Sequence, residues 1–491
     1  MEIKVLDTTL RDGEQTPAVS LMKNDKLRIA SKLDEIGVNY IEAGSAITSE
    51  GERDSIKAIT SEGLNAEILS FSRPIQKDID YCIECDVDAV NLVVSTSDLH
   101  IKDKLKTTHE KLLEMSNNAI EYCKDHGLIV ELSAEDASRT GLDFLEDVFS
   151  QGIQTGADRI CFCDTVGVLT PSKSYKIFSR LSKLDAPLSV HCHNDFGLAV
   201  SNTIAAIEGG AQELHATVNG IGERAGNTSL EEIVTSLYVL FGDEFQTSVK
   251  TQELNSISKL VSRLTGVYLS PNKAIVGENA FAHESGIHSD GVIKNAKTYE
   301  PITPELVGHK RKFIVGKHVG NKGLNTKLLD LGITVNEEQL KCIFDEVKVL
   351  GDRGKTISDV DLQAIAYNVL DIHKEDKIKL VDVNVVSGNK IMPTASVKLN
   401  IAGEEKLEAS VGIGPVDAAI NAVNKALTEF SDIELVEYHV DAITGGTDAL
   451  IDVIVKLKRG DKIISARGTR PDIINASVES YISGINRLIG E

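Results

Sequence analysis

Two histidines, His191 and His193, end an apolar and β-branched stretch at residues 188–193. Side chains two positions apart project from the same face of a β-strand, so the two imidazole rings would lie side by side. Such a pair is often part of a divalent-metal site, but two hydrogen-bonded histidines in a protein core have the same spacing. The pair alone therefore leaves both a metal site and a packed core open.

Other residues that bind metals or polarise carbonyl groups come from distant parts of the chain. Asp12 and Asn227 offer a carboxylate and an amide oxygen, and with two imidazoles they make a set suited to Zn²⁺, Mn²⁺ or Co²⁺ and less naturally to Mg²⁺. Arg11 places a permanent positive charge beside Asp12, where it can stabilise an oxyanion formed on a ketone. An ordinary Arg–Asp salt bridge is the alternative. Cys192 would point to the opposite face of the strand, so it is not expected to be a ligand.

Glu135 and Thr165 are two further candidates. Glu135 supplies a carboxylate that could orient groups or accept a proton, and Thr165 offers a hydroxyl to a substrate carboxylate. A threonine in this position could also serve only as a helix cap. Cys82 and Cys85, by contrast, have no second Cys-x-x-Cys and no suitably spaced histidine, so packing on a helix face is favoured over a zinc or redox role.

The chain that positions these candidates alternates short apolar runs with amphipathic stretches from residue 1 to about residue 241. Eight strand–helix units in tandem predict an α/β fold, a parallel (β/α)₈ TIM barrel. A doubly wound sheet is the alternative, but no Gly-x-Gly-x-x-Gly follows the first strand. We expect strands at residues 3–6, 40–43, 66–70, 89–94, 129–132, 159–163, 188–193 and 213–218. We expect helices at residues 23–36, 75–85, 108–125, 142–155, 171–181, 199–208 and 229–241.

In such a barrel, the residues just past the C-terminal ends of the strands share one rim, where barrel enzymes hold their active sites. Asp12 follows the first strand and Asn227 follows the eighth, and these two strands are neighbours when a barrel closes. Glu135 and Thr165 follow the fifth and sixth strands. The absence of a Cys₃ or Cys₄ set argues against a closed structural site. The rim is therefore expected to carry an open metal centre.

The composition limits the partners of the protein. A formal charge of −22 without a basic patch argues against nucleic acid, whose phosphates are bound through Lys and Arg. The chain starts with a strand-like stretch rather than a charged leader, and it has no apolar run of about 18 residues, so a cytoplasmic protein without membrane contact is expected. Seven scattered cysteines fit reduced thiols better than a disulfide framework.

The length of 491 residues predicts about three units. A catalytic barrel is expected over residues 1–265. Residues 266–365 are expected to be a loop-rich linker, either a connection on the surface or a lid that completes a site. The last unit is expected over residues 366–491.

The last unit contains an internal repeat. Strands expected at residues 379–386 and 395–400 precede a helix expected at residues 416–430, and the same order then recurs. Gly412 and Gly468 mark equivalent positions, 56 residues apart. A duplicated βββα unit with few catalytic residues predicts a regulatory domain that senses a small molecule or a dimerisation domain without a ligand.

Three long motifs, at residues 7–15, 191–199 and 219–227, resemble the signatures of the α-isopropylmalate synthase family, which includes citramalate and homocitrate synthases. The resemblance extends over the whole chain, the linker and the C-terminal repeat included. It implies a Claisen-type condensation, in which the enolate of acetyl-CoA attacks a metal-bound 2-oxo acid and the thioester is then hydrolysed. It also implies a divalent metal, a homodimer, and an amino-acid effector that binds the C-terminal domain.

The resemblance also implies roles for individual residues. Arg11 would steady the oxo group or the enolate, Glu135 would lie near the acetyl group, and Thr165 would hold the carboxylate of the 2-oxo acid. His288 and Tyr299 in the linker match family residues that drive proton transfer, often across a dimer interface. The implied metal ligands are Asp12, His191, His193 and Asn227.

The 2-oxo acid itself is read from less specific positions. Cys161 and Cys163 stand where bacterial isopropylmalate synthases tend to carry Asn-x-Pro, and Asn91 stands where a histidine is frequent. This form resembles the archaeal citramalate synthases, which use pyruvate, and isoleucine is then the expected effector. The alternative is 2-oxoisovalerate as substrate with leucine as effector. The two 2-oxo acids differ by two methyl groups, and a few residues that line the pocket can discriminate a methyl-sized difference by about 1–3 kcal/mol. Asn91, Ser133 and Cys161 are the candidates for lining the pocket.

Two other functions stay open at this point. Related acyl-CoA lyases and carboxylases share the Arg-Asp and His-x-His patterns, although His288 and the C-terminal repeat argue against them. The chain could also be an amino-acid sensor carried on an inert barrel.

Overall fold

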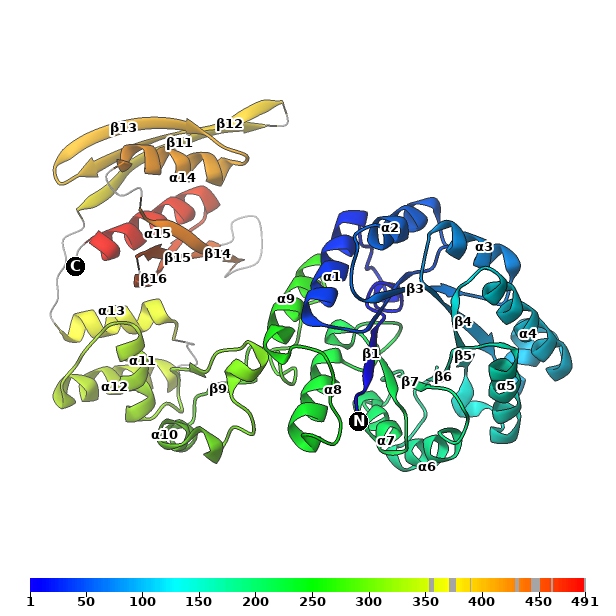
Figure 1. Cartoon of the computed structure of the whole chain (residues 1–491). Helices are drawn as coiled ribbons and strands as arrows, with labels where there is room; N and C mark the ends of the chain where they lie inside the picture. The colour runs from blue at the N-terminus through cyan, green and yellow to red at the C-terminus, as the bar shows by residue number, and fades with distance from the viewer. Residues whose placement is uncertain are drawn as a thin grey trace. The chain divides into compact units, whose positions relative to one another are not determined.

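The computed structural model describes residues 1–352, 357–370, 377–388, 390–428, 432–442, 451–460 and 462–489 (Figure 1). Their contacts divide the chain into two compact units. The first unit comprises Met1–Ala282 and Glu300–Arg311, and the second comprises His283–Tyr299 and Lys312–Glu491. The predicted division into three parts at residues 265 and 365 stays a prediction.

Eight parallel strands form a closed barrel in the first unit, in sequence order from β1 to β8. The barrel closes where β8 pairs with β1, with Leu6 opposite His215. The predicted TIM barrel is therefore confirmed. The strands are β1 (Lys4–Asp7), β2 (Tyr40–Gly44), β3 (Glu67–Ser72), β4 (Ala89–Ser95), β5 (Ile129–Glu135), β6 (Arg159–Asp164), β7 (Leu188–Cys192) and β8 (Glu213–Ala216).

Helices surround the strands, as the blue to green part of Figure 1 shows. Glycines in the left-handed conformation end three of them, Gly37 after the first, Gly156 after the fifth and Gly266 after the ninth, where other residues would be strained. The helices are α1 (Lys23–Ile36), α2 (Glu50–Thr60), α3 (Gln76–Glu84), α4 (His109–Asp125), α5 (Leu142–Thr155), α6 (Pro171–Leu181), α7 (Ala199–Glu208), α8 (Leu230–Ser236) and α9 (Leu254–Thr265).

Several predicted element ends in the barrel differ from the structure. The fifth strand extends to Glu135 instead of ending at residue 132, so Glu135 is its last residue. The seventh strand ends at Cys192, so His193 lies just beyond it and makes an isolated bridge with Asn227. The helix expected at residues 229–241 consists of α8 followed by a π-helix, η5 (Leu237–Phe241). A second π-helix, η2 (His100–Leu105), follows β4 at the rim.

The segment expected to be loop-rich contains more helix than predicted. It holds two short strands, β9 (Ala282–His283) and β10 (Lys312–Phe313), and the helices α10 (Gly286–Lys294), α11 (Asn321–Asp330), α12 (Glu337–Asp352) and α13 (Asp359–Val369). The last three helices share an apolar core that includes Leu324, Ile343 and Leu362, each fully buried. The expectation of a loop-rich linker is therefore wrong for residues 321–369 in the described part of the chain. The helical spacing of Leu340, Ile343, Phe344 and Val347 was the signal for it.

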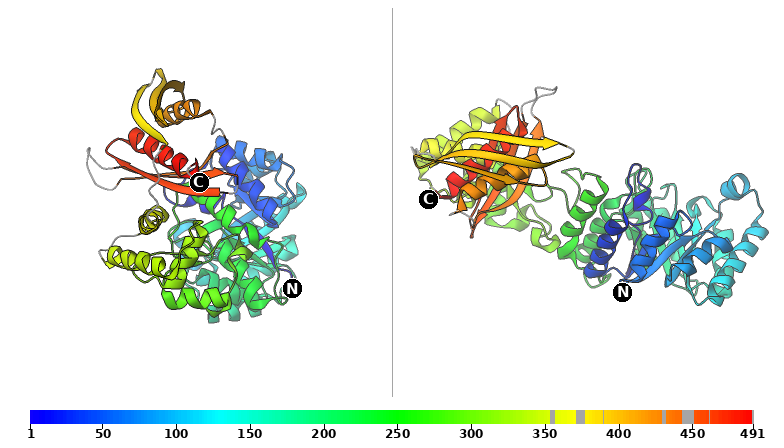
Figure 2. Two further views of the ribbon diagram at one scale, coloured as in Figure 1. Left: turned by 90° about the vertical axis from the view of Figure 1, so that its left-hand side faces the viewer. Right: turned by 90° about the horizontal axis from the view of Figure 1, so that it is seen from above.

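The duplicated βββα unit is confirmed (Figure 2, yellow to orange and red). The first copy consists of the antiparallel strands β11 (Ile378–Gly388), β12 (Ile391–Ile401) and β13 (Glu404–Val411), followed by α14 (Pro415–Ala426). The second consists of β14 (Glu434–Ala442), β15 (Ile451–Arg459) and β16 (Lys462–Arg470), followed by α15 (Ile473–Ile489). The helix expected to reach Phe430 ends at Ala426, and Phe430 lies outside the described residues.

Two predictions from composition can also be compared with the structure. All seven cysteines lie in the described part of the chain, and all are free thiols, as expected. Among the helices that the structure describes, none combines the length and the apolar character that crossing a bilayer requires.

Candidate active site

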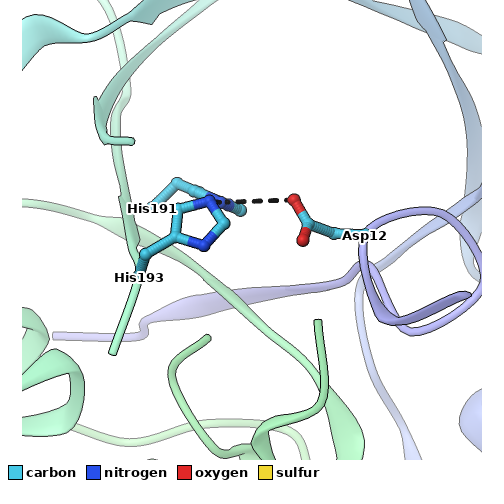
Figure 3. A group of neighbouring side chains, drawn as sticks. All are labelled: Asp12, His191 and His193. Carbon is cyan, nitrogen blue, oxygen red and sulfur yellow. Dashed lines mark hydrogen bonds and ion pairs between the residues drawn. The ribbon is translucent and has the colours of Figure 1, made fainter. Parts of the chain in front are cut away.

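Asp12, His191 and His193 converge at the C-terminal rim of the barrel (Figure 3). The Nε2 atoms of the two histidines lie 3.3 Å apart, and Nε2 of His191 lies 3.6 Å from Oδ2 of Asp12. All three side chains are buried, and one donor atom from each lies within 4.8 Å of the others. The histidines therefore do not form an isolated core pair, and the three residues form a group that can hold a divalent metal ion.

Asn227, the fourth predicted ligand, lies against this group. Its Nδ2 atom donates a hydrogen bond to Oδ1 of Asp12 at 2.9 Å. Its Oδ1 atom is buried and has no hydrogen-bond partner among the described residues. Buried amide oxygens almost always accept a hydrogen bond. An amide oxygen without one, beside two imidazoles and a carboxylate, fits a role as a metal ligand. Gly222 allows this approach, because a Cβ atom there would lie 2.1 Å from Nδ2 of Asn227.

The electrostatics favour the protonation states that metal binding requires. Burial alone would raise the pKa of Asp12, but the Arg11 guanidinium holds that pKa well below its usual range. Burial lowers the pKa of His191, and the neighbouring His193 lowers it further. Burial likewise lowers the pKa of His193. The site therefore presents an ionised carboxylate and neutral imidazoles, which are the ligating forms.

Arg11 is held between two carboxylates. Its Nη1 atom donates to Oδ2 of Asp12 at 2.7 Å, and its Nε atom donates to Oε2 of Glu42 at 2.7 Å. The alternative of a salt bridge with Asp12 is therefore realised. Arg11 also lines a cavity of about 590 Å³ beside the metal group, so it can still reach a ligand there.

Most of the predicted substrate-binding residues line this cavity. Glu135 accepts hydrogen bonds from Nζ of Lys104 at 2.6 and 2.7 Å and from the hydroxyl of Ser95. The hydroxyl of Thr165 accepts a hydrogen bond from the backbone N–H of Asp136 at 2.8 Å, which leaves its own proton for a ligand. The predicted residues that line the cavity are Arg11, Asp12, Asn91, Ser133, Glu135, Thr165, His191 and His193.

Cys161 does not line the cavity. It is fully buried, with its Sγ atom 3.9 Å from Sγ of Cys163, which does line the cavity. Both side chains share one face of β6, but Cys161 lies one layer deeper in the barrel, because it is two residues farther from the C-terminal end of the strand.

His288 and Tyr299, the predicted proton-transfer residues, belong to the second unit. His288 lies on α10, and its ring is 4.4 Å from the ring of Tyr299. The structure places these two residues together, and their role stays a prediction.

Several cavity residues were not predicted. Lys104 comes from η2, where no motif marks it. Arg224 lies within the third motif and donates to both carboxylate oxygens of Asp195 at 2.8 Å, so the motif itself was the available signal. His215 lines the floor and bonds Oε1 of Glu131 through Nε2 at 2.9 Å. Phe71 adds an apolar wall.

Known protein families match successive segments of the chain from residue 2 to residue 489. Three family profiles match: HMGL-like over residues 2–261, homocitrate synthase post-HMGL domain-like over residues 275–355, and LeuA allosteric (dimerisation) domain over residues 356–489. A hydroxymethylglutaryl-CoA lyase structure from Pseudomonas aeruginosa has the same barrel fold, with a TM-score of 0.50, 20% identity, and coverage of 56% of this chain and 96% of that chain.

Three similar curated proteins are synthases. A putative (R)-citramalate synthase of Methanothermobacter thermautotrophicus is 61% identical, covering 100% of this chain and 98% of the relative. The (R)-citramalate synthase of Methanocaldococcus jannaschii is 58% identical, covering 100% of both chains. The 2-isopropylmalate synthase of the same organism is 50% identical, covering 100% of this chain and 95% of the relative.

Proposed function

The chain belongs to the HMGL-like family and, within it, to the citramalate and isopropylmalate synthases, and from this membership we propose that it condenses acetyl-CoA with pyruvate to (R)-citramalate and CoA. Membership makes the protein an acyltransferase. One observation supports pyruvate over 2-oxoisovalerate. The identity to the citramalate synthase of Methanocaldococcus jannaschii is 58%, whereas the identity to the 2-isopropylmalate synthase of that organism is 50%.

The residues of this chain divide the work of such a reaction. Arg11 would donate to the oxo group of the 2-oxo acid, and the Thr165 hydroxyl would donate to its carboxylate. Glu135 would accept a proton from the methyl group of the acetyl thioester. The resulting enolate carbon forms a bond to the carbonyl carbon, and water then hydrolyses the thioester and releases the CoA thiol. His288 and Tyr299 are proposed to supply the proton that the new hydroxyl gains.

Asp12, His191, His193 and Asn227 are proposed to hold the divalent metal. When bound, such an ion polarises a ketone and stabilises the negative charge that develops on its oxygen. Two imidazoles and two oxygen ligands leave Zn²⁺, Mn²⁺, Co²⁺ and Mg²⁺ as candidates. Arg11 adds a second positive charge at the same oxygen, in a cavity where burial strengthens both interactions.

The C-terminal repeat is proposed to regulate the enzyme and to join two subunits. The match to a LeuA allosteric (dimerisation) domain supports both roles. Isoleucine is the proposed effector, since it is the amino acid expected downstream of citramalate.

A panel of 2-oxo acids tests the proposal. Purified protein with Mn²⁺ and acetyl-CoA is supplied with pyruvate, 2-oxobutyrate, 2-oxoisovalerate or 2-oxoglutarate, and free CoA is measured with a thiol reagent. Pyruvate is expected to give the highest kcat/KM, and isoleucine is expected to inhibit. A preference for 2-oxoisovalerate with inhibition by leucine would instead identify a 2-isopropylmalate synthase. Absence of CoA release with every 2-oxo acid contradicts both.

A further inference from the structure

Glu42 on β2 is a fully buried carboxylate that none of the assigned roles uses. We propose that Glu42 is a positioning residue that holds Arg11 in place and couples the wall of the substrate pocket to the metal ligands. The inference rests on the proposed function in assigning Arg11 to the oxo group and Asp12 to the metal ion.

Both oxygens of Glu42 are engaged by residues of the site. Oε2 accepts hydrogen bonds from Nε of Arg11 at 2.7 Å and from the hydroxyl of Thr8 at 2.5 Å. Oε1 accepts a hydrogen bond from Nδ2 of Asn91 at 2.8 Å. A charge that is fully buried is tolerated only when it is paired and hydrogen-bonded in this way. The orientation of the carboxylate is thus fixed by residues from two other strand–helix units, the first and the fourth.

Glu42 determines how Arg11 contacts Asp12. A guanidinium next to a single carboxylate prefers a bidentate pair with two parallel hydrogen bonds. Arg11 instead makes one contact with Asp12, through Nη1, because its Nε atom is held by Glu42. No described residue accepts a hydrogen bond from Nη2 of Arg11, so that group is free for a ligand in the cavity. Without Glu42, Arg11 would turn fully onto Asp12 and compete with a metal ion for its carboxylate.

The other oxygen of Glu42, Oε1, contacts the wall of the pocket through Asn91. Asn91 donates to Oε1 of Glu42 and accepts a hydrogen bond from the hydroxyl of Ser133 at 2.6 Å. These two contacts fix which end of the Asn91 amide faces which neighbour. Asn91 and Ser133 both line the cavity. A buried path of hydrogen bonds therefore runs from the pocket wall through Glu42 and Arg11 to the metal ligand Asp12.

A purely structural role for Glu42 is the alternative, since buried ion pairs also affect stability. Metal affinity and its dependence on Asn91 separate the two roles. Glu213 provides the matched control, because it is a buried carboxylate with a similar environment outside this path. It accepts a hydrogen bond from the Ser189 hydroxyl at 2.9 Å and lies 3.8 Å from Nε of Arg159. In the pairing of β8 with β1, its backbone lies opposite that of Lys4, at the N-terminal end of β1 and away from the rim.

The experiment uses the full-length protein and the variants Glu42→Gln, Glu42→Asp and Glu213→Gln. Thermal unfolding confirms folding, and calorimetric titration of metal-free protein with Mn²⁺ measures the dissociation constant. Glu42→Gln is expected to raise that constant at least ten-fold and to lower kcat/KM for pyruvate at least ten-fold. Glu42→Asp is expected to recover part of both, and Glu213→Gln is expected to leave both within about two-fold. Unchanged Mn²⁺ affinity in Glu42→Gln, or an equal loss in Glu213→Gln, overturns the proposal.

Asn91→Ala tests the coupling and replaces Glu42→Gln if that variant does not fold. It removes the donor to Oε1 of Glu42 and is expected to weaken Mn²⁺ binding at least three-fold, although Asn91 is not one of the ligands. In the double variant Glu42→Gln/Asn91→Ala, the Mn²⁺ dissociation constant is expected to rise by less than the product of the two single-variant fold-changes. The reason is that both substitutions act through one path of hydrogen bonds. Unchanged affinity in Asn91→Ala, or multiplicative losses, overturns the coupling. The Mn²⁺ results stand apart from the proposed function, which is tested by CoA release from the wild-type protein with the panel of 2-oxo acids.

Discussion

Lys104 and Glu135 form an ion pair at the mouth of the cavity, with Nζ of the lysine 2.6 Å from Oε2 of the carboxylate. The lysine belongs to the π-helix η2, a type of turn that is frequent at functional sites. Glu135 also accepts a hydrogen bond from the hydroxyl of Ser95. The two donors hold the carboxylate in one orientation at the edge of the cavity.

Lys104→Met is therefore expected to lower kcat/KM about ten-fold with acetyl-CoA and pyruvate, because Glu135 loses the contact that orients it. The free energy of unfolding should change by less than about 1 kcal/mol, since Lys104 is half-exposed and exposed pairs contribute little. Steady-state kinetics and chemical denaturation measure the two quantities. Lys104→Arg is the control and should retain most activity. Full activity in Lys104→Met would show that this pair does not position Glu135.

Metal removal is expected to abolish CoA release, and Mn²⁺, Co²⁺ or Zn²⁺ should restore it. Binding to the folded state alone raises the melting temperature, so Mn²⁺ should stabilise the wild-type protein. It should not stabilise a variant with His191→Ala and His193→Ala. Cys192→Ala, between the histidines, is the matched control and should bind Mn²⁺ normally. Scanning calorimetry with and without metal measures this, and equal stabilisation of the double variant would place the ion elsewhere.

Arg224 joins two loops of the rim. It makes a bidentate pair with Asp195, and its Nη2 atom also donates to the carbonyl of Thr165 at 2.7 Å. Arg224→Lys cannot make the bidentate pair. We expect KM for pyruvate to rise three-fold or more while stability changes little, because the side chain is 42% exposed. Arg180→Lys, which disrupts a similar surface pair with Glu146 on the outer helices, should leave KM unchanged. Equal KM values in both variants would show that Arg224 does not help to hold the rim loops that bind pyruvate.

Asp7 gives the barrel a pH-dependent stability. Burial raises the pKa of Asp7 to about 7, and its Oδ2 atom has no hydrogen-bond partner among the described residues. The unfolded chain has a pKa of about 3.9 for this group, so between these values the folded protein binds a proton that the unfolded chain has lost. Stability should therefore fall as pH rises from about 4 to about 7 and level off above that.

Asp7→Asn should remove this dependence. The variant keeps an oxygen to accept the backbone N–H of Thr9, which bonds Oδ1 at 2.9 Å. We expect Asp7→Asn to be more stable than the wild type at pH 8 by about 2–4 kcal/mol, and to differ less at pH 4.5. Urea denaturation of metal-free protein at both pH values measures the difference. A constant difference across this range would show that Asp7 titrates normally.

The barrel could be predicted because its strands are buried on both faces and read as continuous apolar runs between helical stretches. The convergence of Asp12 and Asn227 on the two histidines could be predicted as well, since closure of a barrel places the ends of the first and last strands side by side. The exact end of β7 could not, because His193 continues the strand pattern in sequence and leaves the strand only to meet Asn227.

The contacts of Glu42 and Lys104 could not be predicted from the sequence. A carboxylate inside a strand shows neither its partners nor its burial until the neighbouring strands are in place, and Glu42 binds residues up to 49 positions away. The position of the Lys104 side chain depends on a π-helix, which the spacing of apolar residues does not predict. The depth of Cys161 in the barrel likewise depends on the stagger of the strands, which the sequence does not specify.

The pairing of β1 with β8 also bears on how the protein reaches its native state. Asp12 and Asn227, whose side chains are hydrogen-bonded, are 215 positions apart, so a chain emerging from the ribosome cannot unite them until nearly the whole barrel has been synthesised. Contacts between such distant positions form late, because the loop they close costs much entropy. An ion held by both would stabilise the completed barrel, and loss of the ion would first destabilise the pairing between β1 and β8.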